Sequence, residues 1–355
     1  SAAGELKTKP TQHSVKTLME SGVKANVLVC RTEHPINDDI KRKLALFCNV
    51  KQEAVIESID AKTIYDVPLL MQEEGLDKVV LAQLRLPAPE TADLDRWKAF
   101  LHKFKNPKHT IQIGLVGKYV ELQDSYKSIL EALSHAGAIN ETKVEIHSVH
   151  SEYLTLENVA EKLQGLDGVI VAPGFGERGI EGKIEAIRYV REKNIPFLGI
   201  CLGMQMAVIE HARNVLNLSS ANSIEMDEQC ADPVISIMED QKTIINKGGT
   251  MRLGAWKCTL KEGSLVHSIY GNTLIEERHR HRYEFNDEYK KVIEESGLIA
   301  TGINPETSLV EVVENPNHPW FVGVQYHPEY KSTVLDPHPL FINFVEAAQG
   351  YFRSK

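Results

Sequence analysis

The feature that most constrains the fold is a regular alternation of short aliphatic runs and amphipathic segments between residues 111 and 212. Four runs are typical of strands, and a helix-like segment follows each: 111–117, 143–149, 168–174 and 195–201. Strands that are aliphatic on both faces belong to parallel sheets covered by helices on both sides. Ligands bind such sheets at the carboxyl ends of the strands. We therefore expect an α/β domain whose functional residues follow these runs.

The flanking regions extend this picture. Two later runs, 250–260 and 321–327, are also typical of strands, so we expect a parallel or mixed sheet. Residues 1–85 alternate helical patterns with apolar runs, which indicates a second, smaller α/β segment. Between the two, 86–110 carries prolines and charges around one amphipathic helix. We expect a linker there and a main domain over 111–355.

The composition excludes several classes of function. The net charge of -9 argues against a general binder of nucleic acid or of anionic membranes. No apolar run reaches the roughly 18 residues that could span a bilayer, and the first residues lack the apolar segment of a signal peptide. The five cysteines form no CxxC pair, which disfavours a disulfide framework and a zinc site. We expect a cytoplasmic protein with no metal site in this chain.

Cys201 lies between two glycines in the stretch GICLGMQ, where a strand is expected to pass into a helix. The pattern G-x-nucleophile-x-G is typical of an elbow whose small neighbours allow a sharp turn above the sheet edge. Free N–H groups at a helix start favour a thiolate, and the amide of Leu202 would face an oxyanion beside the sulfur. A lone cysteine is more often a small buried hydrophobe. The glycines and the strand-to-helix position favour a nucleophile here.

A cysteine nucleophile needs a base and a residue that orients the base. In VQYHPEY, an aliphatic strand ends at His327, and Pro328 separates this histidine from Glu329. A turn histidine is the plain alternative, and thirteen other histidines compete for the role.

The stretch VIVAPGFGERG also passes from a strand into glycines, so Gly174 is a candidate for the second oxyanion donor. A phosphate-binding loop is the rival interpretation, but neither G-x-G-x-x-G nor the P-loop lysine pattern is present. Together with Cys201 and His327, this stretch favours cysteine-based acyl transfer.

In order and spacing, APGFG, GICLGMQ and QYHPE resemble the class I glutamine amidotransferases over about residues 111–352. Further stretches narrow the resemblance to the CTP synthase family: 116–133, 221–227, 248–254, 277–286 and 317–330. Residues 1–85 are similar to the carboxyl-terminal part of that family's synthetase domain. The resemblance implies an amidotransferase-like sheet with helices on both faces, preceded by a partial α/β synthetase segment.

The resemblance implies that Cys201, His327 and Glu329 form a triad that hydrolyses glutamine through a thioester. It also implies an oxyanion hole made by Gly174 and Leu202. The same comparison supplies the residues expected to bind glutamine: Gly174, Phe175, Gln205, Glu225 and Arg282. Without the family match, Glu225 and Arg282 would be interpreted as solvated charges.

For the rest of the reaction, the resemblance implies that ammonia passes to a synthetase site that uses ATP and Mg²⁺ to convert UTP to CTP. GTP is then expected as an activator, CTP as a feedback inhibitor, and a homotetramer, with filaments, as the assembly. The residues expected to bind UTP or CTP are Lys7, Lys9, Gln12 and Lys43. Lysines suit a triphosphate and a glutamine suits a base or ribose, although KTK alone is more often a solvated charge run. Arg178 and Arg252 are candidates for the GTP site.

Two departures from the family pattern stand out. Ala172 and Pro173 precede Gly174 where the family commonly has P-G-G-F-G, and Ile224 replaces a usual threonine. No G-x-x-x-x-G-K-[ST] loop is present, although ATP-dependent amination requires one. We therefore expect a carboxyl-terminal fragment limited to glutaminase activity. Two alternatives stay open: the glutaminase domain of a GMP or anthranilate amidotransferase, and a non-catalytic module that senses nucleotides and assembles.

Overall fold

A computed structural model describes residues 6–87, 92–122, 124–237 and 251–354 of the chain. The chain divides into two compact units, Ser1–Leu101 and His102–Lys355. The division falls within helix α5, Asp95–Lys105, which belongs to the segment expected as a linker. Residues 88–91 of that segment lie outside the described residues.

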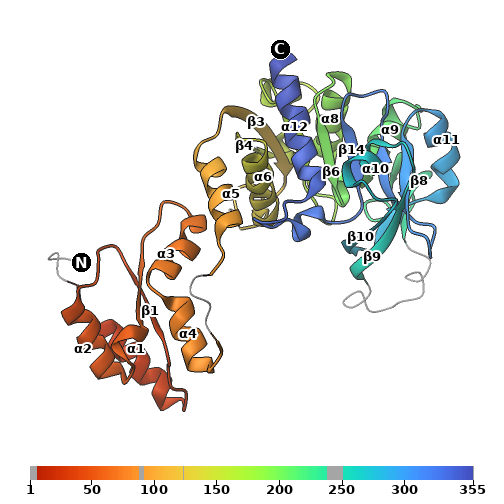
Figure 1. The fold of residues 1–355 in the computed structure, drawn as a ribbon. Coiled ribbons are helices and arrows are strands. Elements are labelled where there is room, and N and C mark those ends of the chain that lie inside the picture. The colour runs from red at the N-terminus through yellow and green to blue at the C-terminus, as the bar shows by residue number, and fades with distance from the viewer. Residues whose placement is uncertain (1–5, 88–91, 123, 238–250, 355) are drawn as a thin grey trace. The chain divides into compact units, whose positions relative to one another are not determined.

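The first unit is a small α/β segment (Figure 1). Its helices and strands are α1 Lys9–Glu20, β1 Leu28–Thr32, α2 Asp38–Cys48, β2 Val55–Ile59, α3 Val67–Glu73 and α4 Leu76–Leu84. Short 3-10 turns cover Gln52–Ala54 and Ile64–Asp66. The two strands pair in parallel, as expected for strands joined by a helix. The described residues of this unit form one core cluster, which includes Leu28, Leu44 and Val55.

The second unit is built on a mixed sheet of nine strands in the order β10-β9-β12-β13-β14-β6-β5-β3-β4. The strands are β3 His109–Gly117, β4 Thr142–His150, β5 Gly168–Val171, β6 Phe197–Ile200, β9 Arg252–Leu260, β10 Leu274–His281, β12 Ile299–Ile303, β13 Val310–Glu314 and β14 Phe321–Val324. From β14 to β4 the neighbours are parallel, and from β14 to β10 they are antiparallel. The prediction of a parallel or mixed sheet is confirmed.

Helices cover both faces of this sheet (Figure 1). One group is α6 Lys127–Ile139, α10 Leu265–Tyr270 and α12 Pro339–Ser354; the other is α7 Val159–Lys162, α8 Ile180–Glu192, α9 Leu202–Asn214 and α11 Lys290–Glu295. Along β6, Phe197 packs in the core with α8 and α9, and Leu198 packs in the core with α6 and α12. This alternation follows from the pleat of a strand that is buried on both faces.

A second, three-stranded sheet has the order β11-β8-β7. Its strands are β7 Ala221–Ser223, β8 Asp232–Ile237 and β11 Tyr283–Phe285.

One expected helix is shorter than its pattern suggests. The segment 156–164 forms only the single turn α7, Val159–Lys162. The Asn158 side chain accepts a hydrogen bond from the Thr155 N–H at 2.9 Å and donates to the Tyr153 carbonyl at 2.8 Å. Such bonds from an asparagine side chain to the backbone stabilise a turn in place of a helix. Gly165, with φ of 83°, follows the helical turn.

Candidate active site

The pairing of β6 with β14 positions the main candidate residues. These strands are parallel neighbours, with Ile200 opposite Val324, so both end at the same edge of the sheet. The Cys201 N–H donates to the Val324 carbonyl at 2.7 Å, which extends the pairing by one residue. Cys201 and the residues that follow Val324 therefore meet at the carboxyl edge.

At Cys201 the chain turns sharply, with φ of 53° and ψ of -104°. This backbone costs a non-glycine residue about 1–3 kcal/mol, and such strain is concentrated at functional sites. A Cβ on Gly199 would lie 2.7 Å from the Gly203 backbone, and a Cβ on Gly203 would lie 2.2 Å from the Val171 carbonyl oxygen. Both glycines are therefore needed for α9 to start this close to β5 and β6.

His327 and Glu329 form a buried pair beside this turn. His327 Nδ1 lies 2.8 Å from Glu329 Oε1, and the two residues are 4% and 5% exposed. Because the carboxylate can only accept, Nδ1 is the donor and Nε2 is the nitrogen left for other partners. Nε2 is buried, and the ring interacts with the Cys201 side chain. Tyr330 stacks on the imidazole with ring centroids 5.0 Å apart, and the His327 N–H donates to the Arg278 carbonyl.

The charge state of His327 depends on these neighbours. Burial lowers its pKa, but the interactions of the ring with Cys201 and with the Glu329 carboxylate outweigh burial and raise the pKa to about 11. These neighbours therefore favour the imidazolium form of His327.

Gly174 and Leu202 lie next to each other beside Cys201. A Cβ on Gly174 would be 3.4 Å from Leu202 Cδ2, in ordinary contact. Leu202 is the first residue of α9, so its N–H belongs to the turn whose donors have no carbonyl within the helix. Two such amides can stabilise an oxyanion if both face the same point.

Lys183 is a residue that the sequence did not single out. It belongs to α8, is 1% exposed, and its Nζ donates to the Ala172 carbonyl at 2.8 Å. Burial and the charge of Lys118 lower the pKa of Lys183 to about 7, against a smaller opposing effect of Cys201. The lysine holds the backbone just before Gly174, where Pro173 has no N–H of its own.

Of the residues expected to bind glutamine, Gly174, Phe175 and Glu225 lie at the turn after β5, whereas Gln205 lies in α9 and its Nε2 donates to the Tyr283 carbonyl at 2.9 Å. Glu225 Oε1 accepts a hydrogen bond from the Gly176 N–H at 2.8 Å, and the Phe175 ring lies 5.9 Å from the Arg280 guanidinium carbon. Burial raises the pKa of Glu225, while the Gly176 N–H, Lys118 and Arg282 oppose this effect. The two charged residues expected to bind glutamine, Glu225 and Arg282, are thus close enough to interact.

The candidate nucleotide residues lie elsewhere. Lys7, Lys9 and Lys43 are exposed in the first unit, and Gln12 Nε2 donates to Thr8 Oγ1 at 3.1 Å.

The two candidate GTP residues differ in environment. Arg178 is exposed, pairs with Glu152 and lies 5.3 Å from the Tyr119 ring centroid. Arg252 is 7% exposed, and its Nη1 lies 2.6 Å from Glu311 Oε1. Arg252 is therefore part of a buried ion pair.

One buried group of described residues has the composition of a metal site: His279, His281 and Glu311. His279 Nε2 lies 2.7 Å from Glu311 Oε2, and its Nδ1 lies 3.0 Å from the Glu277 carbonyl. Burial and the charge of His279 lower the pKa of His281 to about 3. With Arg252 also bound to Glu311, these contacts form an internal charge network.

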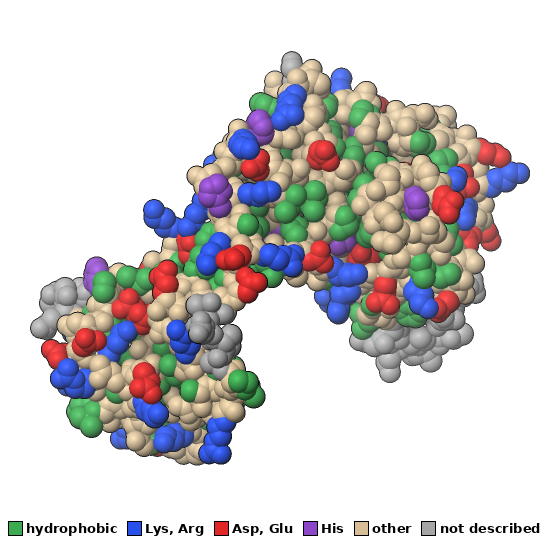
Figure 2. Space-filling model, viewed as in Figure 1, with side chains coloured by type: hydrophobic (Ala, Val, Ile, Leu, Met, Phe, Trp, Pro, Cys, Tyr) green, Lys and Arg blue, Asp and Glu red, His purple; other side chains and the backbone are tan. Residues whose placement is uncertain are grey.

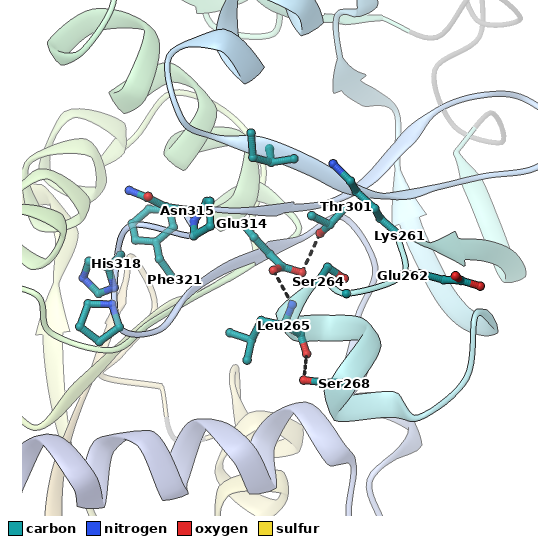
Figure 3. A pocket seen from close by; sticks show the side chains of 14 residues that line it. Lys261, Glu262, Ser264, Leu265, Ser268, Thr301, Glu314, Asn315, His318 and Phe321 are labelled. Atoms are coloured by element: carbon teal, nitrogen blue, oxygen red, sulfur yellow. Dashed lines mark hydrogen bonds between the residues drawn. The ribbon is translucent and has the colours of Figure 1, made fainter.

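A pocket of about 530 Å³ lies apart from this site, between α10 and the strands β12 and β13 (Figure 3). Neither Cys201 nor His327 lines it. Glu314 points toward the start of α10 and accepts from the N–H groups of Leu265 and Val266 and from the Thr301 hydroxyl. Its carboxylate is used within the fold, so we place the candidate chemistry at the edge that holds Cys201.

On the face that Figure 2 shows, Lys and Arg side chains are interspersed with Asp and Glu over both units. None of the helices in the described part of the chain combines the length and the apolar character needed to cross a membrane.

Comparison with known proteins agrees with this geometry. Residues 121–347 match the model of the class I glutamine amidotransferase family, and residues 1–86 match that of the CTP synthase N-terminus. The CTP synthase of Flavobacterium psychrophilum is 70% identical over 98% of this chain and 65% of its own length. That of Cytophaga hutchinsonii is 60% identical over 100% of this chain and 66% of its own length. The chain thus spans about two thirds of these relatives.

A solved structure is also similar to this chain, namely the Trypanosoma brucei CTPS glutaminase domain with bound acivicin. It is 37% identical, with a TM-score of 0.64, over 68% of this chain and 94% of that chain.

Proposed function

The chain belongs to the class I glutamine amidotransferases and, within them, to the CTP synthase family, and from this premise we propose that it hydrolyses glutamine at Cys201. The observation that carries the proposal is the strained turn at Cys201, with the buried His327–Glu329 pair at the same sheet edge. The matches favour this family over the GMP and anthranilate amidotransferases.

In the first step, the Cys201 thiolate attacks the side-chain amide carbon of glutamine. The oxygen becomes an oxyanion that accepts hydrogen bonds from the Gly174 and Leu202 N–H groups. His327 Nε2 then gives its proton to the amide nitrogen, the C–N bond breaks, and ammonia leaves. A glutamyl thioester stays on the sulfur, and Glu329 holds the imidazole in position throughout.

In the second step, neutral His327 takes a proton from water, and the hydroxide attacks the thioester carbon. The C–S bond breaks, which restores the thiolate and the imidazolium. The product leaves as glutamate after its new carboxyl group loses a proton to solvent.

We propose that charge complementarity orients glutamine in this site. Glu225 suits the α-ammonium group, and Arg282 suits the α-carboxylate. Phe175 and Gln205 would hold the rest of the substrate against the oxyanion donors. Support comes from the Gly176 contact of Glu225 and from the electrostatic interaction of Glu225 with Arg282.

For the whole protein, we propose that the ammonia aminates UTP to CTP in an ATP- and Mg²⁺-dependent reaction. We propose that UTP is bound by the exposed lysines Lys7, Lys9 and Lys43 together with Gln12. The product CTP would bind to the same residues as a feedback inhibitor. These residues would lie at an interface of a homotetramer, which also forms filaments. GTP is the proposed activator. The residues of this chain do not fit ATP with magnesium, since the sequence has no P-loop, and we assign no step to that group. All five cysteines are free, which supports a location in the reducing cytoplasm.

The test is the release of ammonia from glutamine by Cys201→Ser. We expect a loss of at least about a thousandfold, because a serine hydroxyl is a far weaker nucleophile beside this histidine. Cys230→Ser is the matched control, since Cys230 is a free, half-buried cysteine in another part of the unit. A Cys201→Ser protein that keeps its activity within tenfold would contradict the proposal and would favour a non-catalytic module.

A further inference from the structure

The sulfur of Cys201 has a neighbour outside the expected triad. Gln325 directly follows β14, is 0% exposed, and its Nε2 lies 3.6 Å from Cys201 Sγ. Its backbone is held as well, because the Gln325 N–H donates to the Glu311 carbonyl at 2.8 Å. A buried amide in this position contacts the reacting atom itself.

The hydrogen-bond network sets the orientation of this amide. The Tyr283 carbonyl can only accept, so the atom of Gln205 that lies 2.9 Å from it is the nitrogen Nε2. The same nitrogen lies 3.1 Å from the Gln325 amide, which must therefore present its oxygen Oε1. The NH₂ group of Gln325 is left to face the sulfur. The orientation thus follows from a chain of contacts that begins at a backbone carbonyl.

We propose that Gln325 is a further catalytic residue, whose side-chain N–H donates to the Cys201 sulfur and stabilises the thiolate before it attacks glutamine. The proposal rests on the proposed function, because only a nucleophilic cysteine needs this donor.

The other contact of the sulfur favours the opposite protonation state. Cys201 Sγ lies 3.9 Å from the Arg280 carbonyl. This carbonyl can accept a hydrogen bond from a thiol, but it has no proton to donate to a thiolate. Hydrogen bonds to an ionised group are stronger than those between neutral groups, so Gln325 favours the thiolate. A neutral amide donates at every pH, whereas Nε2 of His327 donates only while the imidazole carries its second proton, because Nδ1 donates to Glu329. Among the described residues, His327, after β14, and Lys183, from α8, are charged groups that interact with the sulfur.

The experiment measures the reactivity of Cys201 without glutamine. The full chain is treated with iodoacetamide between pH 5 and 9, and mass spectrometry follows alkylation of the peptide that contains Cys201. In Gln325→Met, which keeps the side-chain volume but has no donor, we expect an alkylation rate about tenfold lower at pH 7. The midpoint of the pH profile should move toward alkaline pH. Gln325→Glu should show a larger shift, because a carboxylate repels the thiolate.

Gln349→Met is the matched control. The Gln349 amide also donates a hydrogen bond, to Thr142 Oγ1 at 3.1 Å, but it lies on α12 beside the outer strand β4. The pH profile of Cys201 alkylation in Gln349→Met should equal that of the unsubstituted protein.

An unchanged profile in a folded Gln325→Met protein would overturn the proposal. Circular dichroism establishes whether the variant is folded. If Gln325→Met does not fold, the alkylation profile of Gln325→Glu tests the proposal instead. That variant keeps a side-chain oxygen that can still accept the hydrogen bond from Gln205. The readout is independent of glutamine turnover, so a shifted profile in a protein that does not hydrolyse glutamine would count against the proposed function alone.

Discussion

His327 has an unusual charge state for a histidine that is 4% exposed. Its raised pKa means that the folded protein holds a proton that the unfolded chain releases near pH 6.5. The stability gained from this proton is complete below about pH 6.5 and is lost as the pH rises through the folded-state pKa. The charge of this imidazole is therefore coupled to folding.

This coupling predicts the behaviour of Glu329→Gln. Loss of the carboxylate removes one of the groups that raise the pKa of His327, and glutaminase activity should fall by about a hundredfold or more. The loss in free energy of unfolding should be largest near pH 6 and should shrink as the pH rises toward about 11, the folded-state pKa of His327 in the parent. Urea unfolding at pH 6 and near pH 11 measures this difference, and an equal loss at the two pH values would contradict the assignment.

At the level of single residues, the sequence was informative where a motif carries the chemistry. Cys201, His327 and Glu329 stand in short patterns, and the structure brings them to one edge of the sheet. Gln325 and Lys183 were missed for a physical reason. A lysine within a helix is ordinary in a sequence, and only the packing of α8 shows that this ammonium group is buried against the Ala172 carbonyl.

At the level of elements, the start of α9 is constrained by close packing against β5. Gly203→Ala would place a methyl group 2.2 Å from the Val171 carbonyl oxygen, so α9 or β5 must move. We expect the free energy of unfolding to fall by about 2–3 kcal/mol, as for overpacked cores.

The matched control for this prediction is Gly350→Ala. Gly350 lies in α12 with nothing within 4 Å of an added Cβ, so alanine should stabilise the protein by about 0.5–1 kcal/mol. Urea unfolding of both variants provides the measurement. Equal effects of the two substitutions would show that the close packing at Gly203 is unimportant.

The parallel half of the sheet was predictable; in the antiparallel half the strand at β9 was expected from the run 250–260, but β10 was not. Strands such as β5 and β6 are aliphatic on both faces, and that pattern is visible in the sequence. In β10, burial alternates strictly, but its buried residues include Glu277, His279 and His281. Hydrophobic periodicity cannot detect a buried face made of charged and polar groups, because their partners, such as Glu311, lie far away in the sequence.

At the level of the whole molecule, the two units differ in the size of their cores. The core cluster of the described first unit has six buried members, including Val15 and Cys48, whereas the second unit has two much larger clusters. Leu46, Phe47 and Leu84 of the first unit are also more than 60% exposed. Less burial of apolar surface means less stability per residue.

We therefore predict that the first unit unfolds first. Hydrogen exchange on the full chain should show amides of β1 and β2 exchanging faster than those of β5 and β6. Calorimetry should show a small transition below the main one, since units with separate cores need not unfold together. A single transition with equal protection in both pairs of strands would contradict this prediction.

The contacts of Cys201 also determine when the site can form during folding. Its partners are distant in the sequence: the Arg280 carbonyl is 79 residues away and the Gln325 amide is 124 residues away. Closing such long loops is slow, whereas each βα unit forms from nearby residues. A newly made chain will thus acquire most of its helices before the contacts around Cys201 can form. Under the proposed function, the nucleophile is then activated only when the structure around it is complete, which would protect the folding chain from its own chemistry.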